Sequence, residues 1–80
     1  MTVTVLLFAS YADALGTRSL DMDLGPGATT RDVLGRVRAL PGASRLPSDP
    51  LIAVNERYVK GDRVLEAGDE VAIIPPVAGG

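Results

Sequence analysis

Only one segment of this chain has the clear spacing of an amphipathic helix, and segments that alternate like β-strands lie on both sides of it. Thr29 and Asp32 form a capping-box-like pair at its start, and the Pro-Gly pair at 41–42 ends it. Its apolar face is formed by Val33, Val37 and Leu40. Because one helix covers only one face of a sheet, the pattern predicts a two-layer α+β domain.

Short strands are predicted before and after this helix. The two N-terminal segments, residues 2–9 and 17–24, are joined by a short connection over 10–16, compatible with one helical turn that Gly16 closes. After a loop over residues 41–50, the remaining strands are predicted at 51–54, 58–59 and 70–74. The order β-β-α-β-β-β predicts a mixed sheet of four to five strands with the helix packed on one face.

The face of the sheet that the helix leaves open is predicted to be partly apolar. Side chains alternate between the two faces of a strand, so one face of the first and last strands belongs to the core. The opposite face receives Leu6, Phe8, Ala72 and Ile74. For Phe8 and Ile74, alternation alone leaves open whether they dock a partner or belong to the core.

Composition removes several classes of function. The chain has 80 residues, no cysteine and no histidine, so disulfides, thiolate chemistry and histidine-based acid–base or metal chemistry are excluded. A net charge of −2 without a basic cluster disfavours nucleic-acid binding. No apolar run approaches the ~18 residues of a membrane span, and the N-terminus does not read as a signal peptide. A cytoplasmic location fits these features.

The last six residues, Pro-Pro-Val-Ala-Gly-Gly, follow the final predicted strand. Proline has no backbone N–H to donate to a neighbouring strand, and consecutive prolines favour an extended conformation. We therefore divide the chain into a domain over 1–74 and an extended, flexible tail over 75–80. Six extended residues reach roughly 20 Å. The tail alone is compatible with an arm that enters a partner's active site or with an ordinary frayed terminus.

The C-terminal third of the chain carries the most specific motif. Its last thirteen residues, GDEVAIIPPVAGG (68–80), combine a turn, a strand, a double proline and a diglycine in one register. Further matching positions are Val54-Asn55, Tyr58-Val59, Asp62, Leu65, Leu7-Phe8-Ala9, Leu15-Gly16 and Gly27-Ala28-Thr29. With these residues the whole chain resembles the MoaD/ThiS sulfur-carrier family, and most closely its MoaD branch, the small subunits of molybdopterin synthase.

This resemblance implies a ubiquitin-like β-grasp fold and chemistry at the C-terminus. An adenylating enzyme of the MoeB type would use ATP and magnesium to activate Gly80, which would then become a thiocarboxylate. A large synthase subunit of the MoaE type would use that sulfur to form the molybdopterin dithiolene. The chain itself would be a non-catalytic, sulfur-donating subunit without bound cofactor or metal.

The resemblance also implies roles for particular residues. The tail residues expected to thread into a partner's active site are Pro75, Pro76, Val77, Ala78 and Gly79. The residues expected to dock the partner are Phe8, Tyr58 and Ile74. Three alternatives remain open. The chain could be a sulfur carrier of another pathway, for thiamine, a tungsten cofactor or an amino acid. It could instead be a ubiquitin-like modifier that forms isopeptide bonds through Gly80, or a β-grasp binding module with an inert tail.

Overall fold

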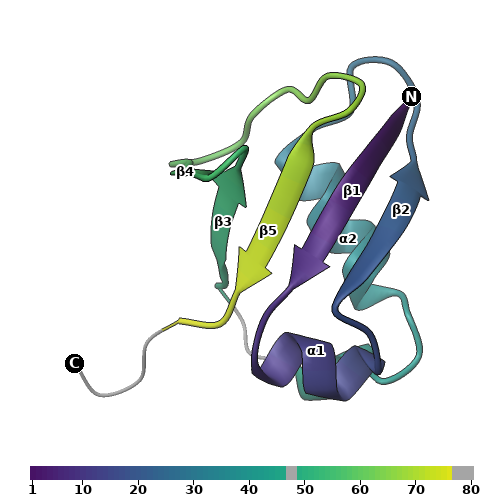
Figure 1. Cartoon of the computed structure of the whole chain (residues 1–80), viewed down its shortest axis with the longest axis vertical. Coiled ribbons are helices and arrows are strands. Elements are labelled where there is room, and N and C mark those ends of the chain that lie inside the picture. Colours follow the sequence, from purple (N-terminus) through teal and green to yellow (C-terminus); the bar gives the residue numbers. More distant parts are fainter. Residues whose placement is uncertain (47–48, 77–80) are drawn as a thin grey trace.

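Five strands form one mixed sheet in the order β2-β1-β5-β3-β4 (Figure 1). The computed structural model describes residues 1–46 and 49–76. The strands are β1 (Thr2–Leu7), β2 (Ser19–Asp23), β3 (Leu51–Val54), β4 (Arg57–Tyr58) and β5 (Glu70–Ile74). β1 runs parallel to β5, whereas the other neighbours are antiparallel. The predicted α+β architecture is confirmed.

Helix α2 (Thr30–Arg38) lies across one face of this sheet (Figure 1). At its start, the Asp32 carboxylate accepts hydrogen bonds from the Thr29 backbone N–H at 2.8 Å and from the Thr29 hydroxyl at 3.2 Å, as the capping-box pattern predicts. Val33 and Val37 are completely buried. Two of the three residues predicted for the apolar face therefore meet the sheet, whereas the third, Leu40, lies beyond Arg38, where the helix ends, and is only half-buried.

The core fills the space between α2 and the sheet. Every second residue of the central strands β1 and β5 points into it, which confirms the predicted alternation. Leu65, from the loop between β4 and β5, is also buried. The core side chains from the strands and loops are Val3, Val5, Leu7, Met22, Leu24, Val54, Leu65, Val71 and Ile73.

The connection between β1 and β2 is a short helix, α1 (Ser10–Leu15), which ends at Gly16 in the left-handed conformation. It follows a tight turn in which the Tyr11 N–H donates to the Phe8 carbonyl at 3.0 Å. The turn requires φ 48° and ψ −121° at Ala9, a backbone region that glycine adopts more readily. The Tyr11 side chain is 1% exposed, so α1 closes one end of the core. A second short helix, η1 (Ala43–Arg45), lies after α2 within residues 41–50, where only a loop was predicted.

Asp62 supports the start of α2 from a distant loop. Its carboxylate accepts hydrogen bonds from the Thr30 hydroxyl at 3.0 Å, the Arg31 N–H at 3.0 Å and the Arg63 N–H at 3.1 Å. The bond from the Arg31 N–H is the main reason that the pKa of Asp62 lies below its usual 3.8. Turn chemistry was predicted for Asp62, and the structure adds that this carboxylate also caps a helix.

The lowered pKa predicts a pH dependence of stability. A carboxylate with a depressed folded-state pKa contributes stability above its unfolded pKa, and this contribution is lost as the pH falls through the folded pKa. We expect Asp62→Asn to lower the melting temperature at about pH 7, and the difference from wild type should shrink as the pH falls below 3.8 and through the lower folded-state pKa of Asp62. Thermal unfolding of both proteins across this range is the measurement. An equal difference at every pH would show that the charge of Asp62 plays no part.

Gly35 lies in the exposed part of α2, and a Cβ placed there would meet no atom within 4 Å. Glycine inside a helix costs about 0.5–1 kcal/mol relative to alanine, so Gly35→Ala should raise the melting temperature by roughly 2–8 °C. Differential scanning calorimetry checks the shift. An unchanged or lower midpoint would mean that the helix needs glycine at this position.

Candidate functional site

The sheet face opposite α2 is apolar along one row of side chains. Strand pairing places Leu6 beside Ala72, Ala72 beside Ala53, and Ala53 beside Tyr58. Because directly paired residues point to the same face of a sheet, this row crosses four strands. Ile74 and its partner Leu51 lie one step further along, at the end of the sheet from which the chain continues toward its C-terminus (Figure 1).

This row forms the floor of a shallow cavity of about 280 Å³, which we call the sheet-face hollow. Its apolar lining consists of Leu6, Phe8, Ala53, Tyr58, Ala72 and Ile74, and its polar lining of Glu56 and Glu70. The apolar patch predicted from alternation is confirmed, because its four residues all line the hollow. The structure also brings together the three predicted docking residues: Phe8 is 45% exposed, Tyr58 is 71% exposed and Ile74 is half-buried.

Four residues of this surface were not predicted from the sequence. Leu51, Ala53, Glu56 and Glu70 reach the open face through the pairing of β3 with β5 and the turn from β3 to β4. Period-two alternation within 51–54 and 70–74 predicts which residues share a face of each strand. It does not predict the order of the strands, and the neighbours of Glu70 and Ala53 depend on which strands lie side by side.

The C-terminal segment leaves the sheet beside the hollow. β5 ends at Ile74, and Pro75 and Pro76 follow it, half-buried and exposed respectively. Phe8 directly follows the neighbouring strand β1, and its N–H donates to the Ile73 carbonyl at 3.3 Å, which holds Phe8 next to this exit. The predicted tail residues Val77, Ala78, Gly79 and Gly80 lie outside the described residues.

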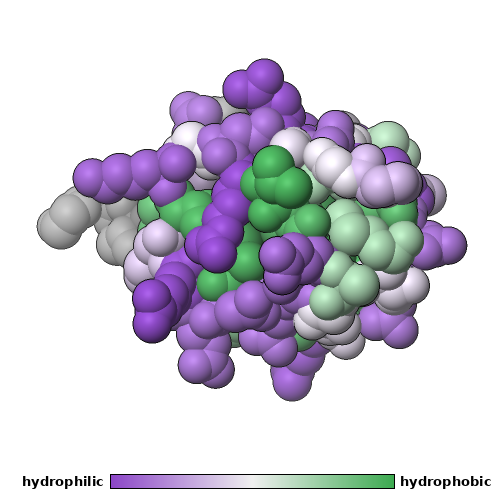
Figure 2. Space-filling view, turned by 90° about the horizontal axis from the view of Figure 1, so that it is seen from above, coloured by the Kyte–Doolittle hydropathy of each residue, from purple (hydrophilic) through white to green (hydrophobic). Residues whose placement is uncertain are grey.

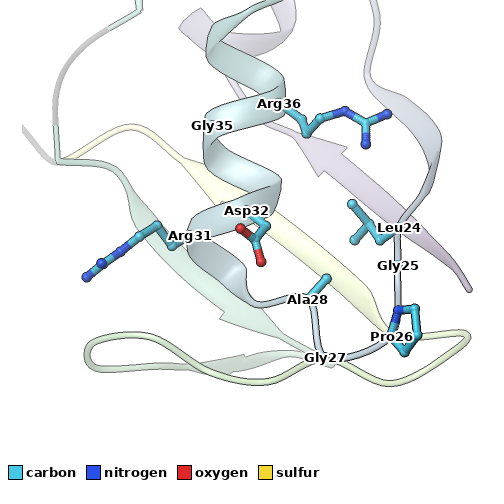
Figure 3. Close-up of a pocket in the computed structure, with 9 residues that line it drawn as sticks. All are labelled: Leu24, Gly25, Pro26, Gly27, Ala28, Arg31, Asp32, Gly35 and Arg36. Carbon is cyan, nitrogen blue, oxygen red and sulfur yellow. The ribbon is translucent and has the colours of Figure 1, made fainter.

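A second hollow, of about 550 Å³, lies between the 24–28 loop and the first turns of α2. Figure 3 shows its two arginines, Arg31 and Arg36, pointing in different directions, with Asp32 between them. The Asp32 carboxylate already caps the helix, and the Arg36 guanidinium donates to the Asp23 carbonyl at 3.2 Å. Asp32 and Arg36 therefore stabilise α2 and its contact with β2. The charged side chains that line this hollow do not point toward a common ligand position.

The described residues include neither a group of side chains that could hold a metal ion nor a helix that could span a membrane. Figure 2 looks down on the end of the molecule where β1 and β5 begin, and it shows hydrophobic atoms framed and crossed by hydrophilic side chains. Within residues 1–46 and 49–76, no cluster of three or more acidic side chains is arranged to hold a metal ion. Among the helices described, none is long and apolar enough to cross a bilayer. The sheet-face hollow is therefore the site with the most distinct chemistry.

Known proteins resemble this chain over its whole length. The model of the ThiS family matches residues 5–80. A curated relative from Chlamydomonas reinhardtii, named molybdopterin synthase sulfur carrier subunit, is 37% identical over 83 aligned residues that cover 100% of both chains. The alignment thus includes the strands around the hollow as well as the C-terminal segment.

Solved structures show the same fold. The crystal structure of SAMP1 from Haloferax volcanii has a TM-score of 0.81 at 29% identity and covers 100% of both chains. A protein from Pyrococcus furiosus, described as a putative molybdopterin converting factor subunit 1, has a TM-score of 0.81 at 30% identity and covers 96% of this chain and 99% of its own. Each overlay includes both layers of the domain.

Proposed function

This chain belongs to the ThiS family, and on that premise we propose that it is the sulfur carrier subunit of a molybdopterin synthase. The observation that carries the proposal is the position of the sheet-face hollow. Its apolar lining includes Ile74, the last residue of β5, so a partner docked there lies beside the point where the C-terminal segment begins. The name of the Chlamydomonas relative, similar over its full length, supports the same function.

The reacting group that we propose is the carboxylate of Gly80. A terminal carboxylate with a pKa near ~3.5 is ionised at neutral pH and is a poor electrophile. An adenylating partner with magnesium-ATP would convert it to an acyl adenylate and release pyrophosphate. Sulfide would then attack the acyl carbon and expel AMP, which leaves a thiocarboxylate on Gly80. The carrier thereby presents sulfur to the next enzyme at high effective concentration.

In the proposed function the catalysis belongs to the partner enzymes, as the family resemblance implies. With neither cysteine nor histidine in the chain, ATP, magnesium and the catalytic side chains would belong to the partners. We propose two of them: an adenylating enzyme of the MoeB type and a large synthase subunit of the MoaE type. Both would use the hollow for docking, while residues 75–79 lead Gly80 into the partner's active site. The lack of side chains on Gly79 and Gly80 would let the chain pass through a narrow channel.

Isolation of complexes from the organism of origin tests this function. We expect the intact chain to co-purify with a large synthase subunit and with an adenylating enzyme. Conjugates in which Gly80 is joined to lysine side chains of other proteins would instead identify a protein modifier. Complexes with the enzymes of thiamine or tungsten-cofactor synthesis, without the large synthase subunit, would assign the chain to another sulfur-transfer pathway.

A further inference from the structure

The sheet-face hollow combines an apolar floor with carboxylates on one side only. Glu56 and Glu70 line it together with six apolar residues, and no lysine or arginine lines it. Over the described parts of the chain, the one ion pair within 4.0 Å joins the N-terminal amine to Asp23, so neither Glu56 nor Glu70 has a cation of its own. Arg57 neighbours Glu56 in sequence but does not line the hollow, as expected because Tyr58, the next residue of β4, points into it.

The backbones that carry these two carboxylates are tied together through Asn55. Its N–H donates to the Glu70 carbonyl at 2.8 Å, and its side-chain oxygen accepts from the Glu70 N–H at 3.0 Å. Its side-chain amide also donates to the Asp69 carboxylate at 3.0 Å. Because Asn55 directly precedes Glu56, these hydrogen bonds fix the Glu70 backbone next to the turn that carries Glu56, and both residues line the hollow.

Glu56 lies in a turn whose backbone conformation is unusual for a glutamate. Asn55 and Glu56 form the two-residue turn from β3 to β4 with φ angles of 50° and 70°. Turns of this type favour asparagine followed by glycine. A glutamate in the second position accepts backbone strain and places a carboxylate at the rim of the hollow. Strained residues of this kind are enriched at functional sites.

We propose that the sheet-face hollow receives an arginine or lysine side chain from the protein that docks on this face. The aliphatic part of that side chain would lie over Ala53 and Ala72, and its cationic end would lie at Glu56 and Glu70. Arginine and lysine combine these two properties in one side chain. The inference rests on the proposed function, and it adds that the partner's docking surface is an apolar patch with a cation at one edge.

A long cationic side chain fits the hollow better than a metal ion does. The lining offers two carboxylates on one rim and an apolar floor, whereas hard cations prefer six or more oxygen ligands. Charge complementarity of this kind contributes mainly to the association rate and to the orientation of the complex. It would therefore orient the partner with respect to the exit of residues 75–80.

Binding measurements at two ionic strengths test the proposal. The dissociation constants of the intact chain with the adenylating enzyme and with the large synthase subunit are compared for wild type and for Glu56→Gln/Glu70→Gln, which keeps the shapes of both side chains. The control Asp13→Asn/Glu66→Gln removes the same charge from exposed positions that do not line the hollow. We expect the hollow variant to bind at least one partner about tenfold more weakly, and the control to bind like wild type.

Salt dependence gives an independent readout. Raising the ionic strength from about 0.1 M to about 1 M shortens the screening length from roughly 10 Å to roughly 3 Å, so wild type should lose affinity and the hollow variant should lose much less. Equal affinity and equal salt dependence of both proteins would overturn the inference, while retained binding would leave the proposed function intact. Wild-type protein that binds neither partner would overturn both. Self-association of the intact chain that the hollow variant abolishes would assign the face to a second copy and also overturn the inference.

Discussion

Deleting Gly80, or adding one residue after it, should abolish sulfur loading while leaving the domain folded. One extended residue spans roughly 3.5 Å, so the shortened terminus falls short of the adenylation centre and the lengthened one passes it. Displacements of about 1 Å from the reactive geometry already cost on the order of a hundredfold in rate. The measurement is the rate of sulfur gain with the adenylating enzyme, magnesium-ATP and sulfide, followed by intact-protein mass spectrometry.

Two comparisons make this result specific to the terminus. Both length variants should melt at the wild-type temperature, because the changed residues lie beyond β5, which ends at Ile74. Gly35→Ala, which alters the helix and keeps the terminus, should gain sulfur at the wild-type rate. If either length variant were loaded as fast as wild type, the carboxylate of Gly80 would not be the group that is activated.

Ile74→Asp should separate docking from folding. Ile74 lines the sheet-face hollow and is only half-buried, so the isolated protein can hydrate a carboxylate there. In the complex the same charge would be enclosed without a partner, which costs roughly 3–5 kcal/mol, or about a hundredfold to several thousandfold in affinity. Titration calorimetry with the adenylating enzyme measures the loss, and circular dichroism of the free variant shows whether it is folded.

The neighbouring residue provides the matched control. Ile73 lies on the opposite side of β5 and is completely buried in the core, so Ile73→Asp should unfold the isolated protein. Similar destabilisation by Ile74→Asp and Ile73→Asp would place Ile74 in the core. Wild-type affinity of a folded Ile74→Asp variant would remove this end of the hollow from the docking surface.

Local sequence patterns were sufficient for most of the fold. Alternation in β1 and β5, and the capping pair Thr29 and Asp32, depend on residues close together in the chain. Helix α1 was underestimated because its six residues are too few to form a stable helix alone. It is held instead by tertiary packing, above all by the buried ring of Tyr11. Helix η1, which was predicted as loop, is only three residues long and packs near α1.

The docking surface was predicted in part. Alternation identified the apolar side chains of β1 and β5 and that of Phe8, directly after β1, and the family resemblance added Tyr58. The two carboxylates at its rim were missed, because the approach of Glu56 to Glu70 requires the pairing of β3 with β5 and the left-handed turn at Asn55. Strand order and long-range pairing are properties of the whole sheet, and no local pattern in residues 51–59 specifies them.

The most direct test of the account is the mass of the wild-type protein after incubation with its adenylating enzyme, magnesium-ATP and sulfide. Conversion of the terminal carboxylate to a thiocarboxylate exchanges one oxygen atom for one sulfur atom. We predict that the intact mass rises by the difference between these two atoms, only when ATP is present, and that fragmentation locates the gain at Gly80. A protein that gains no sulfur with its cognate enzyme, or gains it elsewhere in the chain, would contradict the assignment as a sulfur carrier.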